Sequence, residues 1–407
     1  MNTNTALHRL MREATRLTQA GQLNAATKAI QNALGGGLAG SHFFKGSAQP
    51  STAGAAASRA NPPGDPSLIL DGCVFETGER TTVRTGPDRQ RQAPGYADAG
   101  ADPGTFTSGS HTHAGITRRY KLYTPPQPAG QASALVVMLH GCTQNPDDFA
   151  KGTNMNTLAR EQGFMVLYPE QAHDANPQRC WNWFKHNHQK RGSGEPALIA
   201  NLTQTLVRQH GIDPRRVYIA GLSAGGAMAA IVATAYPDVY AAAGVHSGLP
   251  SGAASSVAEA LMVMKNGGAN GARGAAGHGG RGVKPLVQQA VPTIVFHGDQ
   301  DPTVHPSNGE QVLAAVLASP TGNSGTAPDT ARIAKVEQGV SQYGRHFTRT
   351  TYCDDSGTPL AEHWALHGAG HAWSGGMASG SYTDAKGPDA TREMIRFFFS
   401  LPRRQTH

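Results

Sequence analysis

The stretch from Val217 to Val232, VYIAGLSAGGAMAAIV, decides the fold that we expect for this chain. It predicts a buried apolar strand, a tight turn around Ser223 and then a helix of small residues. The pattern Gly-x-Ser-x-Gly between a strand and a helix is typical of a nucleophile elbow, which presents a serine hydroxyl at the edge of a sheet. Gly221 and Gly225 agree with this interpretation, because side chains there would crowd a strained turn. We therefore predict that Ser223 is a catalytic nucleophile.

Strands and helices are predicted in alternation from residue 118 onward. Short apolar runs, typical of buried strands, are separated by longer segments in which apolar residues recur at helical spacing. This alternation predicts an α/β fold, with a mostly parallel central sheet and helices on both faces. We expect strands at 118–125, 134–141, 164–170, 215–221, 240–248, 291–299, 347–353 and 361–368, and helices at 147–163, 195–211, 226–237, 308–319 and 388–401.

The first 110 residues differ in composition from the rest of the chain. Residues 1–35 are a predicted helical hairpin, whose apolar residues recur at three- and four-residue spacing. We interpret the hairpin either as a packing or dimerising element or as a docking device for a partner or an apolar surface. Residues 36–110 are rich in Gly, Ala, Ser, Pro and Thr and predict a flexible linker. Residues 111–407 are then the catalytic domain, with a mobile low-complexity insertion at 265–282.

Composition argues against several classes of protein. The chain of 407 residues has a net charge of +7, but its Lys and Arg residues are scattered, so we expect no nucleic-acid partner. No apolar run approaches the ~18 residues of a transmembrane segment. Residues 1–21 show no apolar core of a secretory signal peptide, which predicts a cytoplasmic protein. The four cysteines show no Cys-x-x-Cys spacing, so we expect no metal site.

A serine nucleophile requires a base, and the base requires an acid that orients it. In chains with a nucleophile elbow, the acid and then the histidine follow the serine along the chain. The segment 295–306, VFHGDQDPTVHP, places Asp299 and Asp301 after a predicted strand, at the edge of the sheet where ligand sites cluster. We favour Asp301 as the acid, because hydrolases of this type often carry the acid in an Asp-x-x-Val segment, and Asp299 is the alternative.

Three histidines near the end of the chain compete for the role of base. His363 lies within the predicted strand at 361–368, and His367 lies at its end. His371 lies in the glycine-rich segment GAGHAWSGG, which would let the ring reach into a cleft. We favour His371 as the general base.

The oxyanion of an acyl-transfer reaction needs two main-chain amides. The amide of Ala224, at the start of the predicted helix, supplies one. The loop after the strand at 134–141 supplies the other, which we assign to Cys142. The sequence leaves open whether the Cys142 thiol forms a disulfide with Cys180, which a reducing cytoplasm disfavours, or whether both are buried free thiols.

Four motifs occur in order between residues 118 and 402. They are LHGC at 139–142, GLSAG at 221–225, HGDQD at 297–301 and GHAWSGG at 370–376. With these motifs the chain resembles the poly(3-hydroxybutyrate) depolymerase family of esterases, which have the α/β-hydrolase fold. The resemblance implies that Ser223 is the nucleophile, Asp301 the acid, His371 the base and Cys142 part of the oxyanion loop.

The resemblance also extends to the segment CWNWF at 180–184. It implies that Trp181 and Trp183 wall the substrate cleft and that Trp373, beside the base, contacts substrate methyl groups. His140, at the end of its strand, is expected at the same cleft. The alternative for the tryptophans is plain core packing.

The function implied is that of a serine esterase that hydrolyses polyhydroxyalkanoate, such as poly-3-hydroxybutyrate, or its oligomers, without a cofactor or metal. The alternative is a feruloyl, acetylxylan or other polyester carboxylesterase. Two further hypotheses are a relict hydrolase domain that only binds granules and a peptidase. The arrangement resembles intracellular depolymerases, so we expect a cytoplasmic, granule-associated protein, with extracellular location by non-classical export as the alternative. Residues 5–34 would then contact the storage granule or its protein coat.

Overall fold

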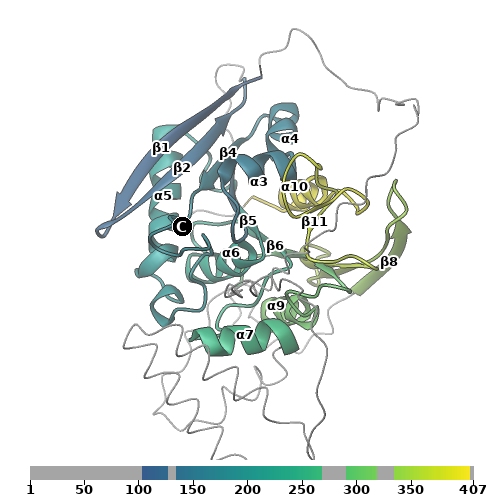
Figure 1. The fold of residues 1–407 in the computed structure, drawn as a ribbon. Helices are drawn as coiled ribbons and strands as arrows, with labels where there is room; N and C mark the ends of the chain where they lie inside the picture. The colour runs from purple at the N-terminus through teal and green to yellow at the C-terminus, as the bar shows by residue number, and fades with distance from the viewer. Residues whose placement is uncertain (1–102, 127–133, 268–289, 319–333, 404–407) are drawn as a thin grey trace, which may run out of the picture. The chain divides into compact units, whose positions relative to one another are not determined.

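The computed structural model describes residues 103–126, 134–267, 290–318 and 334–403. The predicted hairpin at 1–35, the linker up to residue 102 and the predicted insertion from residue 268 onward lie outside the described residues. The described part is built on a ten-stranded sheet and a small two-stranded sheet (Figure 1). The large sheet contains β1 (Thr105–His113), β2 (Ile116–Thr124), β3 (Leu135–Leu139), β4 (Met165–Pro169), β5 (Val217–Leu222), β6 (Ala242–His246), β7 (Thr293–Gly298), β8 (Ala334–Val340), β9 (His346–Cys353) and β10 (Pro359–Leu366), and the small one β11 (Trp373–Ser374) and β12 (Thr383–Asp384).

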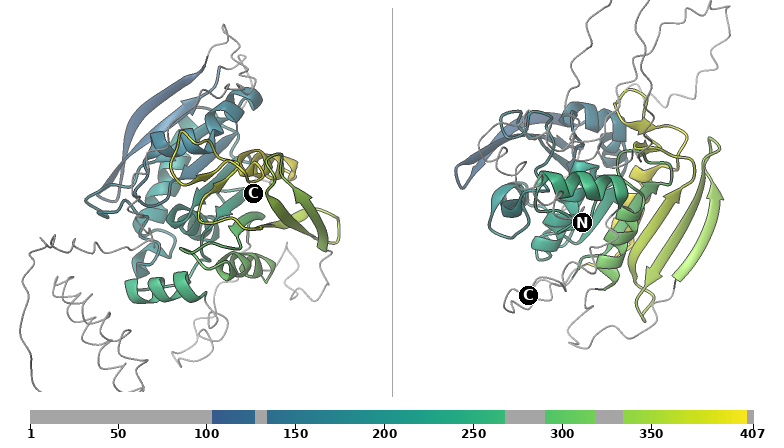
Figure 2. Two further views of the ribbon diagram at one scale, coloured as in Figure 1. Left: turned by 45° about the vertical axis from the view of Figure 1, so that its right-hand side comes forward. Right: turned by 60° about the horizontal axis from the view of Figure 1, so that its bottom comes forward.

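The large sheet has a parallel centre and antiparallel edges. Its strand order is β1-β2-β4-β3-β5-β6-β7-β10-β9-β8. The ladders that join β4, β3, β5, β6, β7 and β10 are all parallel. The hairpin of β1 and β2 flanks one side of this centre, and β9 and β8 flank the other (Figures 1 and 2). This is the strand order of an α/β-hydrolase, so the expected fold class is confirmed.

Helices cover both faces of the sheet, because successive side chains of its buried strands point to opposite faces. In β5, Val217 and Ile219 pack against α5 and α6, whereas Tyr218 and Ala220 pack with the residues of α3, α4 and α10. The helices are α3 (Pro146–Thr153), α4 (Met155–Gln162), α5 (Gly194–Gln209), α6 (Ala224–Ala235), α7 (Val257–Asn266), α9 (Ser307–Leu317) and α10 (Ala390–Ser400), with a short 3-10 helix, η1 (His186–His188).

The sequence-based expectations need correction at β1, β8, α7 and the helix at 147–163. Strand β1 begins at Thr105, so the predicted linker at 36–110 ends too late. Its sequence, TFTSGSHTH, has few apolar residues, because it forms the outer strand of an edge hairpin. Strand β8 and helix α7 were likewise not predicted. The single helix expected at 147–163 is two helices, because Asn154 adopts a left-handed conformation (φ 54°), which asparagine tolerates.

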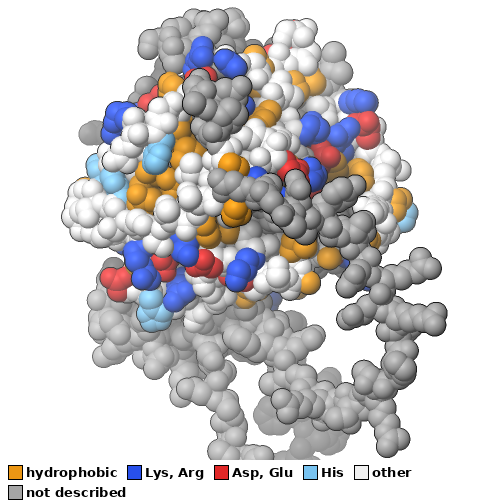
Figure 3. Space-filling view, turned by 90° about the horizontal axis from the view of Figure 1, so that it is seen from above, with side chains coloured by type: hydrophobic (Ala, Val, Ile, Leu, Met, Phe, Trp, Pro, Cys, Tyr) orange, Lys and Arg blue, Asp and Glu red, His pale blue; other side chains and the backbone are white. Residues whose placement is uncertain are grey.

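Charged side chains on the surface occur in mixed groups. Figure 3 shows Lys and Arg side chains beside Asp and Glu side chains on the face that it views. Ion pairs such as Arg345 with Asp384 (3.1 Å) neutralise many of the basic groups. The positive charge of the chain is therefore not gathered into one basic surface on this face. Among the described residues, no helix combines the length and the apolar character needed to cross a bilayer.

Candidate active site

Ser223 occupies the turn between β5 and α6, and its backbone is strained. Its φ of 56° and ψ of −119° lie outside the regions that non-glycine residues normally adopt. The turn is held by a hydrogen bond from the Ser223 amide to the carbonyl of His246 (2.9 Å). A Cβ atom at Gly225 would collide with the carbonyl oxygen of Leu139, and one at Gly221 would collide with Gly225. The two glycines are therefore needed for the strained turn to pack against the end of β3.

Asp301 and His371 form a hydrogen-bonded pair. The distance between Asp301 Oδ2 and His371 Nδ1 is 2.7 Å, and the Asp301 side chain is fully buried. The other carboxylate oxygen, Oδ1, accepts hydrogen bonds from the amides of Thr303 (2.9 Å) and Val304 (2.8 Å). Burial by itself would raise the pKa of Asp301, but the hydrogen bonds from His297 and His371 outweigh it and lower the pKa. The group is therefore a carboxylate, and the Nδ1–H of His371 is the donor.

A second Asp–His pair lies close by on the surface. The alternative acid Asp299 contacts His367, with 3.0 Å between Oδ2 and Nδ1. Both side chains are more than 40% exposed, whereas those of Asp301 and His371 are buried. His363 lies in β10, where burial lowers its pKa to about 4. Of the residues that the sequence left in competition, the structure brings together the buried pair Asp301 and His371 and the exposed pair Asp299 and His367.

Ser223, Asp301 and His371 all lie just beyond the same edge of the sheet. Leu222 of β5 pairs with His246 of β6, His246 pairs with Phe296 of β7, and Phe296 pairs with Trp364 of β10. The four strands are parallel, so their carboxyl ends reach the same level. The turn with Ser223 and the loops with Asp301 and His371 start from these ends, where α/β sheets place their ligands.

His246 links the turn of Ser223 to the loop of His371, a role that the sequence analysis missed. Its carbonyl accepts the amide of Ser223, and its Nε2 accepts the amide of Ser374 (3.0 Å). Its ring also stacks on Trp373, with 5.1 Å between centroids. Burial lowers the pKa of His246 to about 3, so the ring is neutral. Because Nε2 is an acceptor, Nδ1 carries the proton and donates to Ser247 Oγ (3.2 Å). The only sequence signal was a histidine at the end of an apolar strand.

The predicted oxyanion loop is fastened to the segment around Cys180. Cys142 and Cys180 form a disulfide, which decides the question that the sequence left open. The amide of Thr143 also donates to the carbonyl of Gln178 (2.6 Å). A Cβ atom placed on Gly141 would lie 3.7 Å from Cβ of Ser223, so the loop begins directly beside Ser223. The loop is thus held in place by covalent and hydrogen bonds.

The four side chains expected to line the cleft are buried instead. His140, Trp181, Trp183 and Trp373 are each no more than 4% exposed. The Trp181 Nε1–H donates to the His140 carbonyl (3.1 Å), and the Trp373 Nε1–H donates to Thr391 Oγ1 (3.0 Å). Their burial favours the alternative of core packing, and their place along a substrate cleft stays a prediction. The indole N–H groups of Trp181 and Trp373 thus have acceptors inside the protein, as is usual for buried tryptophans.

His140 itself is a neutral ring that joins β3 to the end of β4. The amide of Gln171 donates to its Nε2 (3.1 Å), so its Nδ1–H donates to the Gly141 carbonyl (2.7 Å). Burial lowers its pKa to about 4. Within the described residues, no group of three or more His, Cys, Asp or Glu side chains is arranged to hold a metal ion.

This geometry agrees with the comparison to known proteins. A family model described as Esterase PHB depolymerase matches residues 118–332, which is more than half of the chain. The chain belongs to this family. The matched segment includes Ser223 and Asp301, whereas His371 lies beyond it and is placed by the structure.

Two curated relatives show how this member of the PHB depolymerase family compares with others. It is 32% identical over 273 residues to the poly(3-hydroxyalkanoate) depolymerase C of Paucimonas lemoignei, covering 66% of this chain and 61% of the relative. It is 28% identical over 237 residues to the acetylxylan esterase A of Emericella nidulans, covering 54% of this chain and 71% of the relative. The chain thus spans less than two thirds of the Paucimonas protein.

A solved structure supports the fold of this family member. An acetyl xylan esterase from Aspergillus awamori superimposes with a TM-score of 0.51 and 19% identity. The match covers 72% of this chain and all of that one. At this identity the likeness shows the fold.

Proposed function

We propose that this chain is a serine esterase that hydrolyses poly-3-hydroxybutyrate or its oligomers through an acyl-enzyme. The observation that carries the proposal is the buried hydrogen bond between Asp301 and His371, at the sheet edge that also holds Ser223 in a nucleophile elbow. Membership of the PHB depolymerase esterase family and the identity to a poly(3-hydroxyalkanoate) depolymerase support the same chemistry.

The proposed reaction begins with proton transfer from Ser223 to His371. Because Nδ1 of His371 donates to Asp301, Nε2 is the nitrogen that accepts this proton. The serine oxygen attacks the ester carbonyl, and the imidazolium is stabilised by the Asp301 carboxylate. The imidazolium then protonates the departing alkoxide oxygen as its bond to the carbonyl carbon breaks, and the shortened chain leaves as an alcohol. In the second half, His371 takes a proton from water, which attacks the acyl-enzyme, and the hydroxy acid leaves as Ser223 regains its proton.

The tetrahedral oxyanion is proposed to lie between the amides of Ala224 and Cys142. Ala224 begins α6, whose N-terminal dipole favours negative charge. The Cys142 loop adjoins the nucleophile at Gly141 and is fastened by the disulfide to Cys180. Preorganised amides of this kind stabilise the developing charge without rearrangement.

The substrate ester is the least determined part of the proposal, because relatives that act on different esters match the chain. The chain also matches an acetylxylan esterase and a feruloyl esterase B from Thermothelomyces thermophilus at 28% and 30% identity. An esterase of acetylated or feruloylated polysaccharide is therefore the second candidate. The larger aligned length and identity to the poly(3-hydroxyalkanoate) depolymerase favour the polyester.

A turnover panel tests the proposal. Purified full chain is incubated with hydroxybutyrate trimer, amorphous poly-3-hydroxybutyrate granules, acetylated xylan and methyl ferulate, with Ser223→Ala as the blank. We expect the highest kcat/KM on the hydroxybutyrate oligomer. Faster hydrolysis of acetylated xylan or methyl ferulate would replace the polyester by the second candidate. No hydrolysis of any ester would contradict the enzymatic function itself.

The compartment of the protein and its docking on storage granules can also be tested. The Cys142–Cys180 disulfide favours an oxidising compartment, and so the extracellular alternative over the expected cytoplasmic, granule-associated one. Granule docking through residues 5–34 stays a prediction, since they lie outside the described residues. Because β1 starts at Thr105, a truncation that tests docking should remove residues 1–102 and spare the strand. Docking predicts a loss of turnover on granules but not on soluble oligomers, and an equal loss on both would contradict it.

A further inference from the structure

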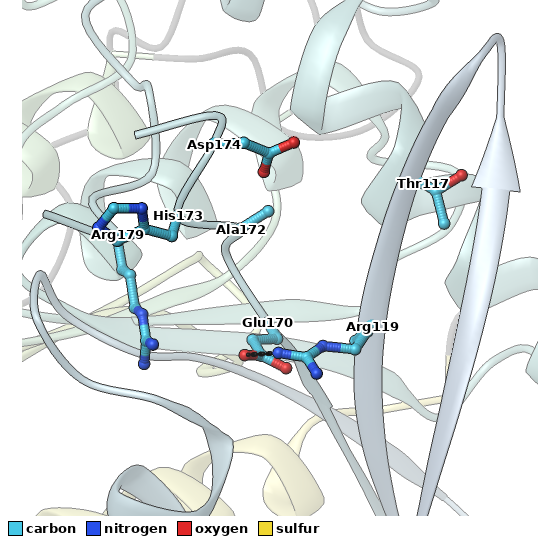
Figure 4. Close-up of a pocket in the computed structure, with 7 residues that line it drawn as sticks. All are labelled: Thr117, Arg119, Glu170, Ala172, His173, Asp174 and Arg179. Atoms are coloured by element: carbon cyan, nitrogen blue, oxygen red, sulfur yellow. Dashed lines mark hydrogen bonds and ion pairs between the residues drawn. The ribbon is translucent and has the colours of Figure 1, made fainter. Parts of the chain in front are cut away.

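A cavity of about 450 Å³ lies at the carboxyl end of β4 (Figure 4). Four of its seven lining residues are charged, namely Arg119, Glu170, Asp174 and Arg179, and His173 also lines it. Neither the family match nor the reaction described above assigns a role to this cavity. Its chemistry points to an ionic ligand.

The cavity neighbours the predicted oxyanion loop. β4 is next to β3, which is next to β5, so the cavity is at the same edge of the sheet as Ser223. The amide of Gln171, which lies between the cavity residues Glu170 and Ala172, donates to His140 at the end of β3. On the other side, Arg179 directly precedes Cys180, which is bonded to Cys142. A molecule bound in the cavity would therefore lie at the same sheet edge as the reacting ester, on β4, two strands along from β5.

Two of the charged groups around the cavity neutralise each other. Arg119 forms an ion pair with Glu170 at 2.9 Å. Among the described stretches of the chain, no carboxylate forms an ion pair with the guanidinium of Arg179. Figure 4 shows this side chain extending away from Asp174, toward the end of the cavity where Glu170 lies. Asp174 is exposed to solvent, which screens its charge. Arg179 is thus the cation that remains available to a ligand.

The backbone holds Arg179 rigidly, in a conformation that is unfavourable for arginine. Its φ is 53°, in the left-handed region, which costs roughly 1–2 kcal/mol for a residue with a side chain. Its amide donates to the Asn176 carbonyl (2.8 Å), and the disulfide follows at the next residue. Strain of this kind is concentrated at functional sites, where the surrounding structure enforces it. The guanidinium is therefore attached to a main chain that is held in place.

We propose that Arg179 is the anchor of a subsite for the free carboxylate of a 3-hydroxyalkanoate, either the end of a short oligomer or the released acid. This inference rests on the proposed function, because polyester hydrolysis generates a carboxylate at every cut. A planar guanidinium suits a carboxylate, to which it can donate two parallel hydrogen bonds. The subsite would position short oligomers with their ionised end in the cavity and an ester bond beside Ser223.

Inhibition by small acids tests the subsite without oligomer turnover. The assay measures hydrolysis of p-nitrophenyl acetate by the full chain in the presence of added sodium 3-hydroxybutyrate or methyl 3-hydroxybutyrate. We expect the acid to have the lower inhibition constant. Arg179→Gly should weaken inhibition by the acid about ten- to a hundredfold, as expected for a hydrogen-bonded charge, and leave inhibition by the methyl ester within about twofold. Glycine accepts a φ of 53°, so this variant should fold.

Two further variants sharpen the test. Arg179→Lys keeps the charge but not the planar fork, so it should recover part of the preference for the acid. Arg208→Ala removes an exposed arginine of α5 and should leave the preference unchanged. An unaltered ratio of the two inhibition constants in Arg179→Gly would overturn the subsite.

Oligomer turnover separates this inference from the proposed function. If hydroxybutyrate trimer is hydrolysed and Arg179→Gly does not change the ratio, only the subsite is wrong. If the ratio changes but the wild-type chain does not hydrolyse the trimer, Arg179 binds anions, and the assignment to hydroxyalkanoates is overturned together with the proposed function.

Discussion

Asp301 Oδ2 and His371 Nδ1 lie 2.7 Å apart, although 70 positions separate the two residues in the sequence. The loops that carry them leave the parallel strands β7 and β10 at the same edge of the sheet. The same two loops hold Asp299 and His367, which also contact each other. The pairs differ in burial, since only Asp301 and His371 are shielded from solvent. The exposed Asp299 can therefore serve as a control when the function of the buried Asp301 is tested by mutation.

Asp301→Asn should lower kcat by roughly 10⁴-fold. The neutral asparagine amide cannot stabilise the imidazolium of His371 as a carboxylate does, and it does not select the required tautomer of the His371 ring. Asparagine at position 299 removes the charge of the exposed pair and should change kcat by less than about threefold, as typical for a surface site. Steady-state hydrolysis of p-nitrophenyl acetate measures both. Similar losses in Asp299→Asn and Asp301→Asn would contradict the choice of acid.

Ser223→Ala should abolish esterase activity and leave the fold intact. The substitution removes the attacking oxygen, and losses of up to about 10⁶-fold in kcat are known for such changes. The alanine methyl group needs no space beyond that of the serine. Circular dichroism and a thermal melt within about 2 °C of wild type would show that the fold is kept. Residual activity above a few per cent would mean that another residue is the nucleophile.

Gly225→Ala should destabilise the protein, in contrast to Ser223→Ala two residues earlier. Its Cβ would meet the carbonyl of Leu139, and main-chain atoms on a central strand cannot move aside. We expect a loss of at least about 2 kcal/mol in the free energy of unfolding, as for an overpacked core. Urea denaturation measures it. Wild-type stability in this variant would contradict the tight packing of the elbow against β3.

Removing the disulfide should destabilise the chain and weaken catalysis. The bond joins residues 38 positions apart, for which the loss of chain entropy predicts up to about 4 kcal/mol. Cys142→Ser or Cys180→Ser should lower the melting temperature and also kcat, since the loop that would hold the oxyanion is freed. Cys353→Ser is the matched control, because Cys353 is a free cysteine. Equal kcat values in Cys180→Ser and wild type would show that the loop does not depend on the bond.

Glu195 should make stability depend on pH in the acid range. It is buried at the start of α5 and accepts hydrogen bonds from Gln171 Nε2 (2.6 Å) and the Asn182 amide (2.8 Å). Burial would raise its pKa, but the contact with His188, followed by these two hydrogen bonds, outweighs burial and lowers the pKa below the usual 4.5. A carboxyl whose pKa is lower in the folded state stabilises the fold fully above its unfolded pKa. That stabilisation is lost as the pH falls through the folded pKa.

Glu195→Gln should therefore lower the free energy of unfolding most at pH 7, by roughly 3 kcal/mol for a broken buried network. The difference from wild type should shrink progressively below about pH 4.5, the ordinary range of a glutamate. Urea denaturation at pH 7, 5, 4 and 3 measures it. A difference that is constant or that grows toward low pH would contradict an ionised Glu195.

Local sequence patterns determined the central strands, most of the helices and the position of the nucleophile turn. The apolar runs of β3, β4, β5, β6 and β7 are buried on both faces, so their composition alone predicts them. Ser223 was predictable because its two glycines must lie within two residues of it. Strand β1 was missed, since a polar edge strand is stabilised by pairing with its neighbour rather than by apolar residues.

Only the tertiary structure decided which groups meet. The segments 299–301 and 367–371 each offered more than one residue, and burial at the sheet edge separated Asp301 and His371 from their exposed neighbours. The same holds for the pairing of Cys142 with Cys180, for the burial of Trp181 and for the neutral His246. A sequence pattern reports on neighbours a few residues away, whereas burial and protonation depend on atoms that folding brings together from distant parts of the chain.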